Sequence, residues 1–190
     1  LQHDIPFWNV ILSAAHFNYR EATATDLRFQ VFTTLAYGGK GIVYFKYLAP
    51  PRGNYRMAPV DQFGNKTRTW EDMRNVNNQI HKLAPVLLEL TSDAVYHFGK
   101  VPPGCEGPPE DSLIIEADPH FMAGDFTHTD GTRYVMLVNR DFHNSHRCLP
   151  KFRVQPKSVE LISAFTGRPI AYTGEQVWFA PGQGMLLRLK

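Results

Sequence analysis

The fold class is decided by residues 27–50, which read LRFQVFTTLAYGGKGIVYFKYLAP. The first half of this stretch places one set of side chains on a single helical face, namely Leu27, Val31, Thr34 and Leu35. Gly38-Gly39 ends the predicted helix, because glycine adopts a left-handed backbone turn at little cost. The run Gly41–Leu48 that follows is apolar and rich in aromatic and β-branched residues, which predicts a strand.

An earlier strand is predicted at Ile5–Ser13, whose sequence is IPFWNVILS. Such a nearly continuous apolar run is typical of a strand that is buried on both faces of a parallel sheet. The helix between the two strands is expected to begin near Thr25, which can cap it just before Asp26 in the first turn. Strand, helix and strand form a βαβ unit, so we expect the two strands to be parallel neighbours.

Another helix is predicted after a long loop at Arg52–Arg68. Thr69 and Asp72 have the spacing of a capping box. Apolar side chains then recur every three or four residues, at Met73, Val76, Ile80, Leu83 and Leu87. We expect Pro85 to kink this helix or to begin a separate final turn.

The character of the chain changes at Gly99, where the stretch KVPPGCEGPPEDS follows. Its Pro, Gly and charge content is typical of a linker, so we predict one domain at 1–99 and a second at 100–190. The second domain shows short strand-like runs separated by turn signals: Leu113–Ala117, Met122–His128, Tyr134–Asn139, Cys148–Val154, Val159–Phe165, Gln176–Phe179 and Met185–Leu189. This regular spacing predicts an all-β antiparallel sandwich.

Three phrases resemble (β/α)8-barrel glycoside hydrolases of the β-galactosidase and related retaining families. Residues 27–50 resemble the segment from the seventh helix into the eighth strand, and 61–87 (DQFGNKTRTWEDMRNVNNQIHKLAPVL) resemble the loop and eighth helix. Residues 177–189 (VWFAPGQGMLLRL) resemble the closing strands of the C-terminal sandwich. The resemblance implies a fragment with an α/β partial TIM barrel of two β/α units, followed by the sandwich. The chain begins at Leu1 without an initiator Met, which agrees with a processed, trimmed or excised piece.

The resemblance does not assign catalytic residues. Retaining glycosidases use two carboxyl groups, one as acid/base and one as nucleophile. The acid/base residue of these families follows the fourth strand, which this chain lacks. Their nucleophile ends the seventh strand, where this chain has Ser13, Ala14, Ala15 and His16.

Substrate-binding candidates are therefore chosen by position, because barrel enzymes bind substrate at the C-terminal ends of their strands. They are Ser13, His16, Lys46 and Tyr47. Tyr47 either stacks on a sugar or fills the barrel, and His16 either hydrogen-bonds a sugar hydroxyl or is an ordinary loop residue. Glu21 follows the first strand, but it also lies just ahead of a helix, where an acid favours the helix dipole.

Three functions remain open on these grounds. The chain forms the rim of the sugar site of a retaining glycosidase, or it is a non-catalytic carbohydrate-binding or structural remnant, or it is an interaction module. An oligosaccharide or glycoside is the expected ligand, and no cofactor is expected. Two strands with helices on one side leave open sheet edges, so we also expect a homo-oligomer or a partner that supplies the missing barrel half.

Composition excludes other classes. The net charge of +2 and the scattered Lys and Arg residues argue against nucleic-acid binding, and no apolar run approaches a membrane span. Cys105 and Cys148 either form a disulfide, which would imply an extracellular or periplasmic protein, or are free thiols. The β region has histidines at His120, His128, His143 and His146, and no pair has a clear metal-binding spacing on one strand face.

Overall fold

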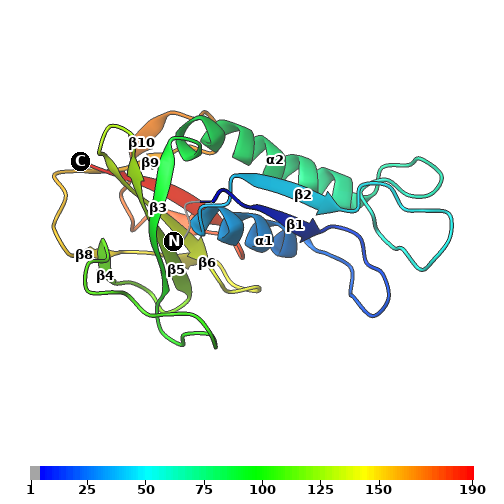
Figure 1. Cartoon of the computed structure of the whole chain (residues 1–190), viewed down its shortest axis with the longest axis horizontal. Helices are drawn as coiled ribbons and strands as arrows, with labels where there is room; N and C mark the ends of the chain where they lie inside the picture. The colour runs from blue at the N-terminus through cyan, green and yellow to red at the C-terminus, as the bar shows by residue number, and fades with distance from the viewer. Residues whose placement is uncertain (1–4) are drawn as a thin grey trace.

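The computed structural model describes residues 5–190, and these residues form two helices and twelve strands (Figure 1). The first elements are β1 (Trp8–Leu12), α1 (Ala24–Ala36), β2 (Gly41–Phe45), α2 (Arg68–Leu87) and β3 (Leu90–His97). Only strands follow: β4 (Ile114–Glu116), β5 (Phe121–His128), β6 (Arg133–Asn139), β7 (His146–Arg147), β8 (Lys151–Phe152), β9 (Val159–Ile162), β10 (Pro169–Ala171), β11 (Trp178–Phe179) and β12 (Gly184–Leu189). Neither helix in this part of the chain is long and apolar enough to cross a bilayer.

The predicted parallel pair is confirmed: β1 and β2 run side by side in register from Trp8 opposite Gly41 to Leu12 opposite Phe45. One face of the pair points to the helices, and Ile11 is fully buried there. The other face is bare, with the Trp8 and Val10 side chains 69% and 60% exposed. The prediction that the first strand is buried on both faces is therefore wrong, because within residues 5–190 nothing covers its outer face.

The predicted α/β partial TIM barrel is also wrong. The largest sheet is antiparallel, has six strands in the order β10-β9-β12-β6-β5-β3, and makes the protein largely β. Across residues 5–190 the parallel sheet is limited to β1 and β2. The physical reason is burial: the apolar sides of α1 and α2 that face away from β1 and β2 are covered by the antiparallel sheet and not by further parallel strands.

Both faces of the antiparallel sheet are buried, and side chains alternate between them. On β6, Met136 and Val138 join the core under α1 and α2, whereas Val135 and Leu137 join a second core on the opposite face. The strand therefore reads as an unbroken apolar run although it belongs to an antiparallel sheet. The second core is closed by two small antiparallel pairs, β4 with β8 and β7 with β11.

The C-terminal end of α1 lies directly against β5. A Cβ atom added at Gly124 of β5 would stand 2.1 Å from the backbone oxygen of Ala36. Glycine is therefore required there by the close approach of helix and strand, and not by its turn-forming ability. Strand β3 was not predicted from the sequence. It lies before the predicted boundary at residue 99 and pairs with β5, so strands from both sides of that boundary build one sheet.

Both helix starts differ from the predictions. The N-cap of α1 is Thr23 rather than Thr25, and Thr23 and Asp26 exchange the two hydrogen bonds of a capping box. The N-cap of α2 is Thr67, without a side-chain hydrogen bond, so the capping box predicted at Thr69 is wrong. Pro85 lies inside α2, which runs unbroken to Leu87, because a proline so close to the end removes only one late hydrogen bond.

Candidate functional site

The four predicted binding residues lie together where β1 and β2 end. Ser13 directly follows β1 and is fully buried. Its backbone N–H donates to the Phe45 carbonyl over 2.8 Å, and its hydroxyl donates to the Lys46 carbonyl over 3.2 Å. Ser13 therefore holds the two strand ends together, while His16, Lys46 and Tyr47 extend beyond them. The peptide bond between Phe45 and Lys46 is cis.

The His16 ring lies inside a group of aromatic rings, which we call the aromatic cluster: His16, Phe17, Tyr19, Phe45 and Tyr55. Centroid distances from His16 to the other four rings are 5.3, 5.0, 5.1 and 5.5 Å. Nδ1 of His16 lies 3.0 Å from the Ala14 carbonyl. Because a carbonyl only accepts, Nδ1 carries the proton and Nε2 remains the acceptor of the ring.

The aromatic cluster reaches the surface. Phe17, Tyr19 and Phe45 are 74%, 56% and 38% exposed. The Lys46 ammonium lies 5.0 Å from the centroid of Tyr55 and 5.7 Å from that of Phe45, within cation–π range. Large aromatic side chains that gather at the surface beside a polar group are typical of a binding surface.

A second aromatic group joins Tyr47, which follows β2, to Trp70 in the first turn of α2. The indole N–H of Trp70 donates to the Tyr47 hydroxyl over 3.2 Å, and Tyr47 is 51% exposed. The Lys66 ammonium lies 3.8 Å from the Trp70 ring centroid. We call these two rings the Tyr47–Trp70 pair. Sequence reasoning found Tyr47 by its position after the strand and missed Trp70, because a tryptophan in the first turn of a helix carries no functional signal of its own.

Two loops are bound to each other to form this end of the molecule, which lies away from the antiparallel sheet (Figure 1). Ala15 and Arg56 exchange backbone hydrogen bonds of 3.0 and 2.9 Å. The Asn54 side chain accepts from the Phe17 N–H and donates to the Phe17 carbonyl. Arg56 also donates to the Tyr19 carbonyl. The aromatic side chains therefore stand on a cross-linked backbone.

The acidic residues next along the chain are already engaged. The Asp26 carboxylate accepts from Arg20 and from Thr23, as part of the α1 cap. Burial raises the pKa of Asp26, but the hydrogen bonds from Arg20 and Thr23 outweigh this effect and hold the pKa below its usual value. Glu21 is paired with Arg56 across 3.9 Å. Asp26 therefore lacks the raised pKa that a general acid needs.

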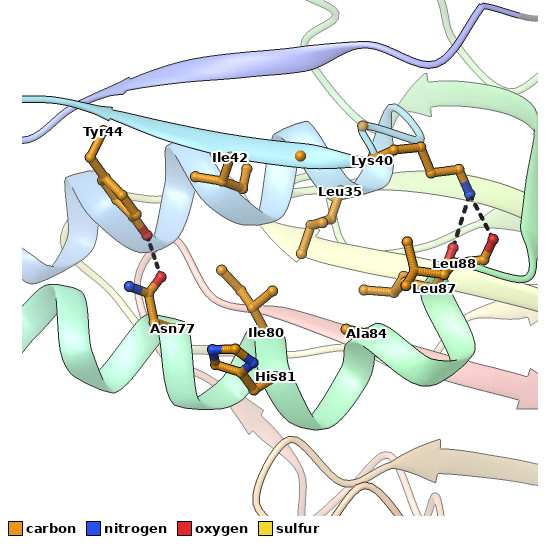
Figure 2. A pocket seen from close by; sticks show the side chains of 12 residues that line it. Leu35, Lys40, Ile42, Tyr44, Asn77, Ile80, His81, Ala84, Leu87 and Leu88 are labelled. Carbon is orange, nitrogen blue, oxygen red and sulfur yellow. Dashed lines mark hydrogen bonds between the residues drawn. The ribbon is translucent and has the colours of Figure 1, made fainter.

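A separate groove of about 310 Å³ runs between β2 and α2 (Figure 2). Its walls are mostly apolar, and polar groups stand at its ends. At one end the Tyr44 hydroxyl donates to Asn77 over 2.7 Å, and burial raises the pKa of Tyr44 to about 12. At the other end the Lys40 ammonium donates to the Leu87 and Leu90 carbonyls. Because these polar groups are already paired, the groove offers apolar surface and few specific contacts.

The β region holds one group of side chains able to bind a metal. One ligand atom each from Asp118, His120 and His146 lies within 4.8 Å of the others. The sequence predicted no metal-binding pair on one strand face. The group in the structure combines two segments instead, because His120 precedes β5 and His146 lies on β7. The two cysteines are free thiols, and burial raises the pKa of Cys148 to about 12.

The chain matches no protein-family model, and no curated protein is significantly similar to it.

Proposed function

We propose that the chain binds a sugar through the aromatic cluster, as part of a glycoside-hydrolase-like protein. The observation that carries the proposal is the exposure of Phe17 and Tyr19 on a surface where five rings converge. A pyranose presents apolar C–H faces that pack on aromatic rings, and hydroxyls that need polar partners at the rim. The acceptor Nε2 of His16 and the ammonium of Lys46 supply such partners.

The proposed role of the chain by itself is binding without hydrolysis. Retention or inversion requires two carboxyl groups that flank the glycosidic bond. Asp26 is held in the α1 cap and Glu21 is paired with Arg56, so these acids serve the structure. The resemblance of residues 27–50 and 61–87 to glycoside hydrolases favours a sugar over other ligands that bind aromatic surfaces.

Calorimetric titration of the purified chain with methyl β-galactoside, methyl β-glucoside and the matching disaccharides tests the proposal. We expect saturable binding in the millimolar range, because a few stacked rings provide a modest free energy. Phe17→Ala and Tyr19→Ala should each weaken binding by about 2–10-fold, corresponding to about 0.5–1.5 kcal/mol for one ring contact. Phe165→Ala is the matched control, since Phe165 is an 88% exposed phenylalanine outside the cluster.

Two results would contradict the sugar-binding role. One is the lack of saturable binding with every glycoside, and the other is an equal loss of binding in Phe165→Ala and Phe17→Ala. Turnover of nitrophenyl glycosides that a single Asp or Glu substitution abolishes would show that the chain is itself a hydrolase, and so would overturn the non-catalytic part of the proposal.

Self-association is a second candidate function and rests on a different observation. The outer face of β1 and β2 is uncharged and exposes Trp8, Val10 and Val43, and each strand has one edge that pairs with no strand in residues 5–190. Parallel sheets are almost always covered on both faces, and open edges add further strands. A second copy of the chain has the same uncharged face, so a two-fold contact between the two copies would cover this face on each of them.

A further inference from the structure

We propose that Asp118, His120 and His146 form a binding site for a divalent transition metal of the Zn²⁺ class, with Asp141 orienting His146. The site is independent of the sugar-binding proposal. Its ligands come from the turn before β5 and from β7, and one ligand atom of each side chain lies within 4.8 Å of the others. The two imidazole rings face each other with centroids 4.0 Å apart and an angle of 13° between their planes.

Hydrogen bonding prepares His146 for a metal. The Asp141 carboxylate lies 3.0 Å from Nε2 of His146 and also accepts from the backbone N–H groups of His143 and Asn144. Because the Asp141 oxygen accepts this bond, the proton lies on Nε2 of His146 and Nδ1 keeps a free lone pair. A carboxylate that orients a histidine in this way is the usual outer partner of a metal ligand.

His120 and Asp118 provide the movable half of the site. Asp118 Oδ1 accepts from the His120 backbone N–H over 2.9 Å and lies 2.8 Å from Nδ1 of the same residue. The side chains of His120 and Asp118 are 46% and 33% exposed, against 20% for His146. A metal must lie near the plane of each ring that binds it, so the exposed His120 ring turns out of its stack on His146. The same turn releases the Asp118 carboxylate.

The ligand set favours zinc-like ions. Two imidazole nitrogens and one carboxylate oxygen are ligands that Zn²⁺ accepts at about 2.0–2.1 Å, with water at a fourth position. Tetrahedral bonds of that length place donor atoms about 3.3 Å apart, so the donors must come closer than the 4.8 Å spread, which the turn of the exposed His120 ring allows. Ca²⁺ and Mg²⁺ prefer oxygen ligands and are not expected to bind.

The local charge agrees with a dication. Two carboxylates lie at the cluster, Asp118 beside His120 and Asp141 beside His146. The Arg140 guanidinium donates to the carbonyls of Phe98 and Pro119 and is held there. Carboxylate oxygens at the site favour a cation as the ligand.

The test is calorimetric titration of the chelator-treated full chain with ZnCl2, together with the visible spectrum of the Co²⁺-loaded protein. We expect one ion per chain, a dissociation constant in the micromolar range or below, and a Co²⁺ spectrum typical of nitrogen and oxygen ligands. His120→Ala and His146→Ala should each weaken binding at least tenfold, and Asp141→Asn by about tenfold, as expected of an outer partner. MgCl2 and CaCl2 should give no saturable signal.

His143→Ala is the matched control, because His143 lies on the same loop and contacts Asp141 only through its backbone. It should bind Zn²⁺ as the unmodified chain does. The proposal is overturned if the unmodified chain shows no saturable binding, if His143→Ala and His120→Ala lose affinity equally, or if His120→Ala binds unchanged. Because His120 is exposed, its alanine variant tests the site even if His146→Ala fails to fold.

Discussion

Removing the Tyr96 hydroxyl tests the buried polar network that links the antiparallel sheet to the β4 segment. Tyr96 is fully buried on β3, and its hydroxyl donates to Asp125 over 2.9 Å while it accepts from the Ile114 N–H over 3.1 Å. Asp125 also accepts from the Leu113 N–H over 2.7 Å. Burial is the main reason why the pKa of Tyr96 lies far above its usual value, so the hydroxyl keeps its proton.

Tyr96→Phe leaves two buried groups, the Asp125 carboxyl and the Ile114 N–H, with one partner fewer. Each buried group that loses a partner costs about 1–3 kcal/mol, so we expect the free energy of unfolding to fall by about 2–6 kcal/mol. Tyr172→Phe is the control, because that hydroxyl makes one bond, to the Cys148 carbonyl over 2.6 Å. Its removal leaves one group without a partner and should cost about 1–3 kcal/mol, half as much as Tyr96→Phe.

Urea unfolding at pH 7, followed by circular dichroism, measures both variants. Equal midpoints for Tyr96→Phe and Tyr172→Phe would refute the reasoning, because the first variant is expected to lose two buried hydrogen bonds and the second only one. A Tyr96→Phe midpoint equal to that of the unmodified chain would refute it as well, since the network would then contribute nothing to stability.

Three further predictions concern other parts of the structure. Burial raises the pKa of Asp125 from 3.8 to about 6, so the folded chain binds a proton that the unfolded chain releases between these pH values. The contribution of Asp125 to the free energy of unfolding should therefore increase by about 2 kcal/mol when the pH falls from 7 to 4. The measurement is the difference in unfolding free energy between the unmodified chain and Asp125→Asn at each pH. Gly124→Ala should lower the unfolding free energy by at least about 1–3 kcal/mol, because the new methyl group meets the Ala36 carbonyl; a neutral effect in urea unfolding would show that α1 does not press on β5. Val10→Lys should shift any concentration-dependent assembly to the monomer in sedimentation velocity, whereas Phe165→Ala should not; a monomeric unmodified chain would rule out self-association.

The local sequence predicted local features well. Apolar periodicity located both helices, and the apolar runs of β5, β6 and β12 located the central strands of the large sheet. Strand β3 was missed for two reasons. Its sequence, LTSDAVYH, contains charged and hydroxyl side chains, because β3 is an edge strand, and no turn signal separates it from α2. The cap of α1 was placed two residues late, because Thr23 and Thr25 both precede Asp26 and only the backbone distinguishes them.

The candidate sites were also predicted only in part. Ser13, His16, Lys46 and Tyr47 were chosen because they follow the two parallel strands, but the sequence did not tell that Ser13 is buried and Tyr47 is exposed. Tyr55 reaches the aromatic cluster, and Trp70 reaches Tyr47, only through contacts between distant segments of the chain. The proposed metal-binding group was invisible in the sequence, because Asp118 and His146 are separated by β5 and β6 and meet only in the folded chain.

The sequence by itself determined where both helices and most strands form and that β1 and β2 run parallel, since these depend on periodicity and on short connections. Only the tertiary structure decided what the helices pack against. Within residues 5–190, α1 and α2 pack between the parallel pair and the antiparallel sheet, and the outer face of β1 and β2 stays uncovered. That choice depends on the total apolar area that all elements bury together, which is a property of the whole chain and not of any one segment.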